Sequence, residues 1–313
     1  MATVLCVVGP TATGKTKMGV ALAERCNGEV VSVDSMQIYR GMAIGTAAPT
    51  AEEMAGVPHH MVGVADPAES WSAARYAQAA DSCVQDILRR GKLPVLVGGT
   101  GLYLDALIRG TDFAAGAQGT ALRQQLQQRM AAEGAAALRE ELRGVDPETA
   151  AKLPLRDEKR IIRALEIWYE TGRTMTEHDR LERQRPPRYD AVYIGLDFLD
   201  RQDLRDRIDA RVDAMVEQGL LTEVEALLSG GVPREATALQ AIGYKQFLAV
   251  SEGTATREEA IEEVKLRSRQ YAKRQLTWLR RNPDIYWIRW ERQPNFPAGL
   301  QKATEYLHSR GLC

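Results

Sequence analysis

The sequence predicts an α/β fold in which helices flank a parallel sheet, and three observations support this prediction. Short apolar runs rich in β-branched residues recur at 3–8, 29–33, 93–97, 191–196 and 285–290. Segments with helical periodicity separate these runs, and such alternation is typical of parallel strands joined by crossover helices. A glycine-rich turn also follows the first run directly, at the end of a strand where α/β proteins bind their ligands.

That turn has the sequence of a phosphate-binding loop, because it fits G-x-x-x-x-G-K-[ST] at every fixed position. Its residues are Gly9, Pro10, Thr11, Ala12, Thr13, Gly14, Lys15 and Thr16. The two glycines allow consecutive backbone N–H groups to turn inward, and the helix that follows adds its positive dipole end. We expect Lys15 to reach the outer phosphate oxygens and Thr16 to offer its hydroxyl to Mg²⁺. A glycine-rich turn without a ligand is the alternative.

Composition describes an ordinary globular protein with local rather than global chemical features. The 313 residues leave room for two domains, or for one domain with an insertion. The four cysteines (Cys6, Cys26, Cys83 and Cys313) are scattered without a C-x-x-C pair, which favours a reducing cytoplasm. The first apolar run is too short for a membrane span and no export signal precedes it, so we expect a cytoplasmic protein without a membrane partner. A net charge of −1 means that any surface for nucleic acid must be local.

Two polar residues follow other predicted strands. Asp34 comes after the run 29–33, and Thr100 follows 93–97 within Gly-Gly-Thr-Gly-Leu-Tyr. The carboxyl ends of parallel strands share one edge of a sheet, so we expect both residues to face the same cleft as the phosphate-binding loop. Asp34 could bind Mg²⁺ through water or act as a general base, or it could be a turn or N-cap aspartate. Thr100 could be a second contact in the cleft or a simple N-cap threonine.

The middle of the chain changes character, since 112–188 contains no convincing strand. Helices are predicted over 120–142, from 145 and over 158–171, with an extended basic linker at 183–188. We therefore predict an all-helical insertion domain at 112–188. It divides a P-loop NTPase-like core into a first part, 1–111, and a second part, 189–313. The adjacent His59 and His60 lack a third metal ligand nearby, which favours a structural role.

The last long helix, predicted over 257–281, carries a local basic stripe. Its second half, from 265, contains seven Lys and Arg residues and no acid, with Tyr271 and Trp278 interleaved. This pattern favours contact with a phosphate backbone, although basic residues also complement the dipole at a helix end. A helix over 201–218 mixes both charges, and composition alone gives its Arg211 no special role.

From the residues alone, the protein is a P-loop enzyme that either transfers a phosphoryl group or holds a diphosphate leaving group. A set of motifs resembles the bacterial tRNA dimethylallyltransferases, in the same order from residue 4 to about residue 281. These are the phosphate-binding loop, Ser32–Met42, Gly45–Ala47, Pro58–His60, Gly98–Tyr103, Arg160–Glu166, Ile242–Tyr244 and Lys273–Arg280. The family attaches a dimethylallyl group, taken from dimethylallyl diphosphate, to N6 of adenosine-37. It acts on tRNAs that read codons beginning with U, gives N6-dimethylallyladenosine and releases diphosphate.

The resemblance implies a role for each candidate residue. The loop Gly9–Thr16 would hold the diphosphate, with Mg²⁺ as cofactor shared with Thr16. Asp34 matches the general base that takes a proton from the adenine amine, and Thr100 matches a residue that contacts the base. Arg211 matches a cleft arginine that binds the diphosphate, so that it and Lys15 would neutralise charge on the leaving group. The adenine would be flipped out of the anticodon loop to reach the cleft.

The resemblance also implies contacts with the tRNA anticodon stem-loop. The residues concerned are Asp34, Ser35, Met36, Gln37, Thr100, Arg123, Lys159, Arg160, Ile161, Ile162, Arg163, Gln240, Ala241, Ile242, Gly243, Tyr244 and Lys245. Two positions depart from the family pattern, because Ala43 and Ala48 stand where Asp and Lys are common. No C-terminal zinc-finger pattern is present, so we expect no zinc, and we expect a monomer.

Other functions stay open at this point. A prenyltransferase that acts on free AMP or ATP would have little need for the basic stripe or the helical insertion. A P-loop nucleotide kinase and a non-catalytic, NTP-dependent RNA-binding switch are further alternatives. Asp34 discriminates among them, because Asp34→Ala should retain tRNA binding and lose prenyl transfer only if the resemblance is correct.

Overall fold

The computed structural model describes residues 1–111 and 121–313, and the chain forms two compact units. The larger unit combines residues 1–108 with 188–313, and the smaller unit spans 109–187. The predicted insertion, 112–188, begins within 112–120, which lie outside the described residues. Each unit is described by itself below.

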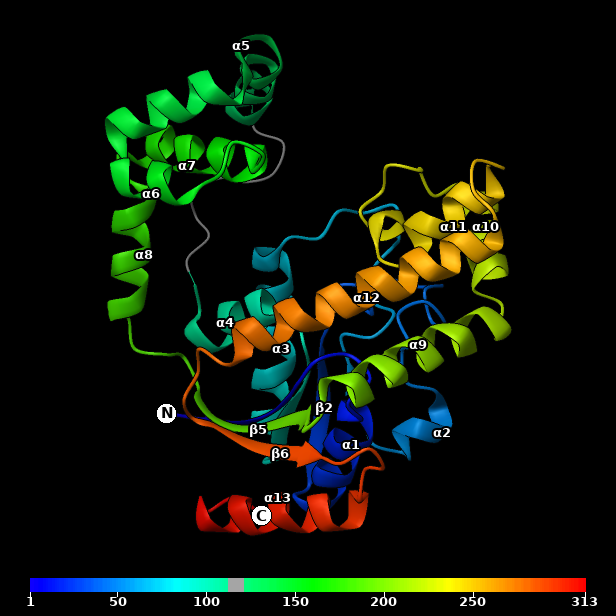
Figure 1. The fold of residues 1–313 in the computed structure, drawn as a ribbon. Coiled ribbons are helices and arrows are strands. Elements are labelled where there is room, and N and C mark those ends of the chain that lie inside the picture. Colours follow the sequence, from blue (N-terminus) through cyan, green and yellow to red (C-terminus); the bar gives the residue numbers. More distant parts are fainter. Residues whose placement is uncertain (112–120) are drawn as a thin grey trace. The chain divides into compact units, whose positions relative to one another are not determined.

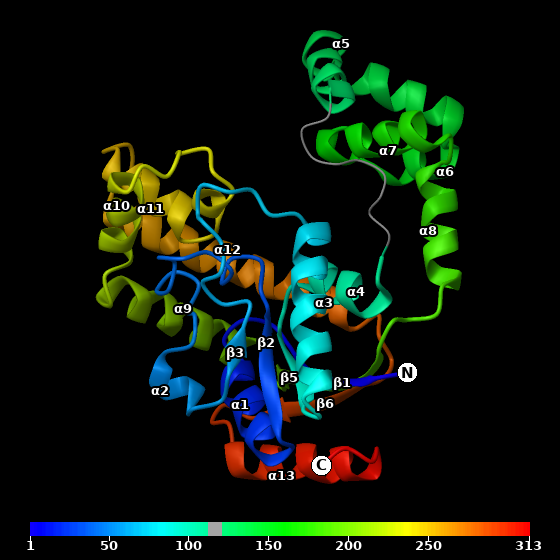
Figure 2. The ribbon, with the colours of Figure 1, turned by 180° about the vertical axis from the view of Figure 1, so that it is seen from behind.

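The larger unit is built on a six-stranded parallel sheet with the strand order β3-β2-β4-β1-β5-β6 (Figures 1 and 2). The strands are β1 (Thr3–Val8), β2 (Gly28–Val33), β3 (His59–His60), β4 (Leu93–Gly98), β5 (Asp190–Phe198) and β6 (Ile285–Trp290). Five of them coincide closely with the predicted apolar runs, and the α/β, P-loop NTPase-like class is confirmed. The two-residue edge strand β3 was not predicted.

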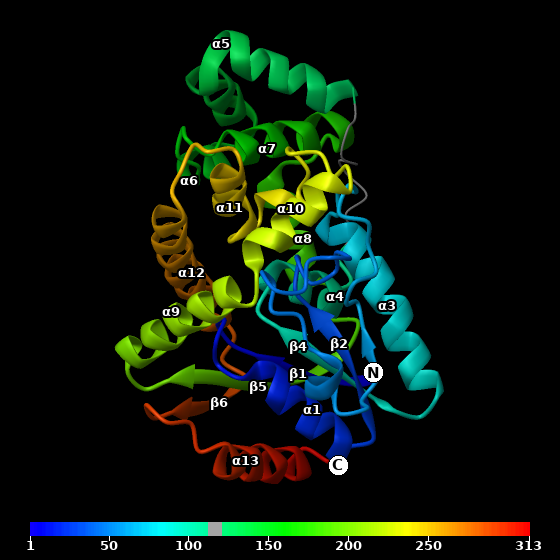
Figure 3. The same ribbon diagram turned by 90° about the vertical axis from the view of Figure 1, so that its right-hand side faces the viewer.

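Helices connect these strands and cover both faces of the sheet. They are α1 (Lys15–Arg25), α2 (Ala51–Met54), α3 (Ala73–Arg89), α4 (Gly101–Arg109), α9 (Arg201–Glu217), α10 (Leu220–Ser229), α11 (Tyr244–Ser251), α12 (Arg257–Leu279) and α13 (Phe296–Ser309), with a short 3-10 helix, η1 (Ala238–Gln240). Figure 3 shows α1 and α13 on one side of the sheet, whereas α3, α4, α10 and α11 lie on the other.

Strand β1 explains why its sequence is apolar without interruption. Val4, Cys6 and Val8 pack into the core beneath α3 and α4, whereas Leu5 and Val7 pack into the core beneath α1 and α13. Both faces of the strand are therefore buried, as expected for a central parallel strand. Each such side chain contributes about 1.5–3 kcal/mol through burial, so the two cores hold the strand ends firmly in place.

The smaller unit contains helices and connecting loops but no strand in its described residues, 109–111 and 121–187. It contains α5 (Ala121–Val145), α6 (Pro147–Lys152), α7 (Glu158–Thr171) and α8 (Met175–Gln184) around a core that includes Leu138 and Leu165. Helix α5 is interrupted at Gly134, whose φ of 83° and ψ of 164° are not helical, so the single predicted helix is two segments. Helix α8 also extends into the start of the linker predicted at 183–188.

Two features of the larger unit differ from expectation. Helix α13 was not predicted, although Asn295 caps its first turn by accepting a hydrogen bond from the Ala298 N–H at 3.1 Å. Cys26 and Cys313 form a disulfide, a pairing that the sequence analysis did not predict. Their separation of 287 residues hides the proximity that the fold creates between the end of α1 and the segment after α13. Among the described residues, no helix is long and apolar enough to cross a membrane.

Candidate active site

The carboxyl ends of three neighbouring strands bring the candidate residues together. Strand β4 pairs with β2 on one side and with β1 on the other. The phosphate-binding loop follows β1, Asp34 follows β2 and Thr100 follows β4. Crossover connections place these turns at the same edge of the sheet, which is the position expected for a ligand site. Arg211 reaches this edge from α9, since its charge and that of Asp34 both act on Lys15.

The phosphate-binding loop folds around the carbonyl of Pro10. The Thr13 hydroxyl donates to this oxygen at 2.9 Å, and Lys15 Nζ donates to it at 2.7 Å. Gly14 has a φ of 85°, a left-handed value that favours glycine, and it immediately precedes α1. At Gly9 a side chain would collide with the carbonyl oxygen of Leu196 in β5. The loop therefore needs glycine at both positions, for backbone conformation at one and for space at the other.

Two basic side chains of the site, Lys15 and Arg211, are close enough for their charges to interact, and the carboxylate of Asp34 acts on both. Burial lowers the pKa of Lys15 to about 7, and the nearby Arg211 charge adds to this effect while Asp34 opposes it. Burial also lowers the pKa of Arg211, against the charges of Asp34 and Glu53. The buried Nε of Arg211 has no hydrogen-bond partner among the described residues. Such a pair is costly unless an anion joins it, so the electrostatics favour an anionic ligand.

Asp34 has one oxygen in use and one open. Its Oδ1 accepts hydrogen bonds from the N–H groups of Met36, at 2.9 Å, and Gln37, at 3.4 Å. This is the turn aspartate that the sequence left open, but it accounts for one oxygen only. Its Oδ2 makes no hydrogen bond within the described part of the chain. A half-buried carboxylate with a fixed orientation and a free oxygen is suited to accept a proton.

Thr100 ties two strand ends together rather than capping its own helix. Its hydroxyl accepts a hydrogen bond from the Ser35 N–H at 3.3 Å and lies 3.5 Å from the Tyr271 hydroxyl. Its own N–H donates to the Val33 carbonyl at 3.3 Å. The side chain thus joins the turn after β2 to the turn after β4, with α12 supplying the third partner.

Helix α12 contacts both glycine-rich turns through Gln275, a residue whose role the sequence did not reveal. Gln275 is 5% exposed, accepts from the Thr11 N–H at 3.0 Å and donates to the Gly99 carbonyl at 3.1 Å. The turn at 98–101 has no room for a side chain at any of its three glycines. A Cβ at Gly98 would collide with the Val33 carbonyl, one at Gly99 with Gln275, and one at Gly101 with Trp278.

The segment that follows Asp34 is held by residues far away in sequence. Glu223 on α10 accepts hydrogen bonds from the N–H groups of three consecutive residues: Ala43 and Ile44, each at 2.8 Å, and Gly45, at 3.0 Å. The Tyr244 hydroxyl, on α11, donates to the same carboxylate at 2.6 Å. The sequence analysis missed Glu223, because its partners are backbone groups about 180 residues away and form no local pattern.

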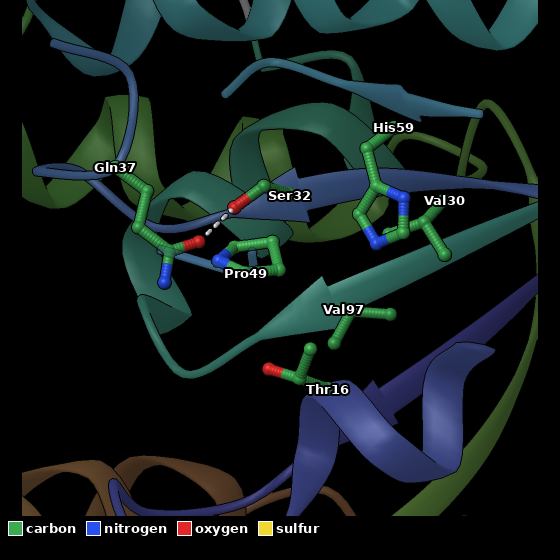
Figure 4. Close-up of a pocket in the computed structure, with 7 residues that line it drawn as sticks. All are labelled: Thr16, Val30, Ser32, Gln37, Pro49, His59 and Val97. Atoms are coloured by element: carbon green, nitrogen blue, oxygen red, sulfur yellow. Dashed lines mark hydrogen bonds between the residues drawn. The ribbon is translucent and has the colours of Figure 1, made fainter. Parts of the chain in front are cut away.

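A cavity lies beside the phosphate-binding loop (Figure 4). Its lining residues are Thr16, Val30, Ser32, Gln37, Pro49, His59 and Val97. The space that it offers to water-sized molecules is only about 20 Å³, far below the roughly 300–1,000 Å³ of most ligand pockets. Figure 4 shows the Ser32 hydroxyl bonded to Gln37, whereas the Thr16 hydroxyl makes no bond to the other residues drawn.

His59 and His60 each have a polar partner at one ring nitrogen, and the buried Nε2 of His59 has none among the described residues. His59 Nδ1 lies 2.8 Å from the Val57 carbonyl, and burial lowers the pKa of this side chain. His60 Nε2 lies 2.8 Å from the carboxylate of Glu29, at the amino end of β2. The described residues contain no group of three or more His, Cys, Asp and Glu side chains that could hold a metal ion.

The basic stripe on α12 is narrower than its composition indicates. Lys265, Arg267, Arg269 and Arg280 each pair with a carboxylate, those of Asp213, Glu263, Asp209 and Asp197 respectively. The remaining three basic side chains, Lys273, Arg274 and Arg281, are exposed and pair with no carboxylate in the described ranges. Arg274 lies over the ring of Tyr271 and Arg281 over that of Trp278.

The other residues implied to contact tRNA fall in two places. In the smaller unit, Lys159 and Arg160 are exposed, while Arg123 and Arg163 both pair with the fully buried Glu166. Ile161 and Ile162 are buried in the core of that unit, so their side chains do not face solvent. In the larger unit, Gln240 and Lys245 are exposed, Ile242 is half-buried, and Ala241, Gly243 and Tyr244 are buried.

Comparisons with known proteins give one consistent result. A family model described as IPP transferase matches residues 37–282, and one described as Isopentenyl transferase matches residues 2–62. The chain is 48% identical to the tRNA dimethylallyltransferase of Halalkalibacterium halodurans over 282 residues, which are 90% of this chain and 89% of the relative.

Two solved structures are similar over almost the whole chain. The full-length tRNA isopentenylpyrophosphate transferase from Bacillus halodurans is 42% identical, with a TM-score of 0.74 and coverage of 99% of this chain and 96% of its own. A eukaryotic dimethylallyltransferase acting on tRNA is 28% identical, with a TM-score of 0.82 and coverage of 99% and 80% respectively. The similarity therefore extends over both units of the chain.

Proposed function

This chain belongs to the tRNA dimethylallyltransferase family, and from that premise we propose the reaction and the roles of its residues. Dimethylallyl diphosphate gives its dimethylallyl group to N6 of adenosine-37, in the anticodon loop of tRNAs that read codons beginning with U. The products are N6-dimethylallyladenosine and diphosphate. The observation that carries this proposal is the shared edge of the sheet, where the phosphate-binding loop, Asp34 with its free Oδ2, and Thr100 follow neighbouring parallel strands.

The chemistry follows from what each residue can do at that edge of the sheet. The bond between the allylic carbon and the diphosphate oxygen breaks, and a bond from adenine N6 to that carbon forms. Asp34 accepts the proton that N6 loses, which offsets the poor nucleophilicity of a conjugated amine. Lys15 and Arg211 neutralise the charge that grows on the departing diphosphate, in a setting where burial makes each interaction strong. Thr100 supports the base-binding side, because it is bonded to the turn that carries Asp34.

Mg²⁺ is the cofactor that we propose for this site, and the residues present fit it. The Thr16 hydroxyl is half-buried at the start of α1, without a bond to the other residues drawn in Figure 4. Mg²⁺ typically takes one or two protein oxygens and completes its shell with substrate phosphates and water. A bound Mg²⁺ would supply positive charge to the diphosphate. Thr16 would hold it, and the loop from Gly9 would cradle the phosphates with backbone N–H groups.

The tRNA surface that we propose combines the anticodon-loop contacts at 34–37 and 240–245 with the unpaired basic side chains of α12. Lys273, Arg274 and Arg281 supply exposed positive charge, and two of them lie against aromatic rings. In the smaller unit, Arg123 and residues 159–163 would contact the same RNA. Within 159–163, the side chains that make the contact would be those of Lys159, Arg160 and Arg163. We also propose that the protein acts as a monomer. We propose the cytoplasm as its location because tRNA is there, although disulfides are uncommon in that compartment.

The experiment that tests this proposal is incubation of the protein with unmodified tRNA, Mg²⁺ and dimethylallyl diphosphate, followed by mass analysis of the nucleosides. We expect a mass gain of one dimethylallyl group on a single adenosine. A parallel incubation replaces tRNA with AMP or ATP and should give no product. Product from the free nucleotide alone would assign the protein to the nucleotide prenyltransferases. Phosphate release from ATP without any transfer would favour a kinase or an NTP-dependent switch.

A further inference from the structure

The carboxylate of Glu223 folds the backbone at 43–45 around itself. Three consecutive N–H groups donate to it at 2.8–3.0 Å, and the Tyr244 hydroxyl adds a fourth donor at 2.6 Å. Gly45 allows this close approach, because a Cβ there would lie 2.5 Å from the Tyr244 ring. Helices α10 and α11 lie side by side and are anchored in the core, so they present the carboxylate from a rigid base (Figure 3).

The loop that Glu223 holds is also the loop that holds Gln37. The Gln37 amide donates to the carbonyl oxygens of Thr46, at 3.3 Å, and Ala47, at 3.2 Å. Its Oε1 accepts from the buried Ser32 hydroxyl at 2.8 Å. Both N–H donors of the amide are therefore engaged, and one acceptor position on Oε1 is left. This network defines the orientation of the amide, since backbone carbonyls can bond only to its nitrogen.

Gln37 in turn belongs to the turn that carries the general base. Its backbone N–H donates to Asp34 Oδ1 at 3.4 Å, beside the stronger bond from Met36. A continuous path of bonds thus runs from α10 through 43–47 to the Gln37 amide and on to Asp34. The residues that lead along this path to Gln37, which are Glu223 on α10 and residues 43–47, do not directly follow a strand of the sheet. The network therefore holds the turn of Asp34 from outside the sheet.

We propose that Glu223 is a positioning residue for the adenine side of the active site. It shapes the backbone at 43–45 so that the next two carbonyls fix the Gln37 amide, and through Gln37 it orients the turn of Asp34. This inference rests on the proposed transfer to RNA. It predicts a selective defect: the RNA substrate loses its fit, whereas the phosphate-binding loop, which Glu223 does not touch, keeps its affinity for dimethylallyl diphosphate.

The test is a double-mutant cycle of Glu223→Gln and Gln37→Ala, with an anticodon stem-loop RNA and dimethylallyl diphosphate as substrates. A glutamine offers one acceptor oxygen and turns an NH₂ group toward backbone donors, so the clamp is lost. We expect Glu223→Gln to lower kcat/KM for the RNA by about tenfold or more, as loss of alignment typically does. The KM for dimethylallyl diphosphate should stay within about twofold. In the Gln37→Ala background the effect of Glu223→Gln should shrink to less than about threefold.

Two further variants keep the test decisive. Glu29→Gln removes a more deeply buried carboxylate with several partners, at the end of β2 opposite Asp34, and should lower Tm without separating the two substrates. Tyr244→Phe removes one donor and leaves the three backbone bonds. It should lower kcat/KM for the RNA by about threefold, and it carries the test if Glu223→Gln does not fold.

The outcomes separate this inference from the proposed function. Effects of Glu223→Gln and Gln37→Ala that multiply, or an equal rise in KM for both substrates, would overturn the positioning role. The same substrate-selective loss in Glu29→Gln would overturn it too, since it would then follow from general destabilisation. A wild-type protein that transfers nothing to RNA would overturn the proposed function and, with it, the role of Glu223.

Discussion

The two ends of strand β2 differ in whether their charged groups have partners. At the amino end, Glu29 is 2% exposed and has three basic partners: Arg90 Nη2 donates at 2.7 Å, Lys92 Nζ donates at 2.8 Å, and His60 Nε2 lies at 2.8 Å. The hydrogen bond from Arg90 is the largest cause of its pKa lying well below the usual range. At the carboxyl end, Asp34 keeps a free oxygen and the buried Arg211 Nε has no partner.

The difference indicates that the charged groups at the amino end of β2 serve stability, whereas those at the carboxyl end serve function. The charges around Glu29 compensate one another, so the fold gains from them and needs nothing further. Beside the phosphate-binding loop, the buried Arg211 Nε has no hydrogen-bond partner among the described residues, and this costs stability until a ligand binds. Substitutions at the two ends should therefore move different observables, and the following predictions are arranged from the largest effect to the smallest.

Asp34→Asn should lower the rate of transfer by about 10³-fold, because an amide keeps the bonds to the turn but cannot take the proton. Single-turnover transfer to the stem-loop RNA measures this loss. Binding of the RNA and the Tm should remain close to those of the wild type, since one oxygen of Asp34 still accepts from Met36. A variant with wild-type transfer would show that the carboxylate is only a turn former.

Arg211→Met should lower kcat/KM for dimethylallyl diphosphate by about 10²-fold, through loss of charge stabilisation on the leaving group. The same change should raise the free energy of unfolding by about 1 kcal/mol, because it removes a buried charge without a hydrogen-bond partner at Nε. Urea unfolding and steady-state kinetics on one preparation test both. We therefore expect activity to fall while the free energy of unfolding rises. A fall in both would contradict our description of the carboxyl end of β2.

Glu29→Gln should lower the free energy of unfolding at pH 7 by about 2 kcal/mol and leave transfer unchanged. We expect less than the full cost of breaking a buried pair, because the side chains of Arg90 and Lys92 are 40% and 33% exposed. A carboxyl group whose pKa is lowered by folding stabilises the protein at pH values above the ordinary pKa of that group, which is 4.5 for Glu29. That contribution begins to fall as the pH drops below about 4.5 and is lost only as the pH passes the much lower pKa of the folded state, so the difference between wild type and variant should narrow in acid. Urea unfolding at pH 7 and pH 4 measures the difference; a gap that widens in acid would contradict it.

The same distinction between compensated and uncompensated charge applies to α12, with a smaller expected effect. Arg281→Gln should reduce the slope of log affinity for RNA against log salt by about 1, the loss of one phosphate contact. Arg269→Gln should leave that slope unchanged, because Arg269 already pairs with Asp209 at 2.6 Å. Affinities for stem-loop RNA across a salt series give both slopes, and equal slopes for the two variants would count against the proposed surface.

The sheet and the location of the site were predictable from the sequence for a simple reason. Central parallel strands are buried on both faces, so their composition shows them directly, and their carboxyl ends indicate where ligand groups gather. The helix predicted over 158–171 is α7, with the same bounds. Helix α13 also carries a readable signal, an Asn cap at 295 with Pro297 in the first turn, which the periodicity argument did not use.

The remaining features depend on contacts that no local pattern encodes. Glu223 and Gln275 bond to backbone groups far away in the sequence, and neither residue type announces such partners. The sequence gives the number of basic residues in the stripe. The four ion pairs that neutralise part of it involve carboxylates on α9, on α12 itself and on β5, and no local pattern indicates the pairs with α9 and β5. Burial of Ile161 and Ile162 likewise follows from packing within the smaller unit.

The turn at 98–101 has a consequence for how this protein would behave under selection. Each of its three glycines lies against a different neighbour: the Val33 carbonyl, the Gln275 amide and the Trp278 ring. A survey of random mutants scored by growth would therefore rank these positions with Asp34, although they hold no reactive group. At the three glycines, substitutions would be rare because there is no room for a Cβ atom. At Asp34 they would be rare because the carboxylate takes part in the reaction, and only a direct assay of transfer would distinguish the two causes.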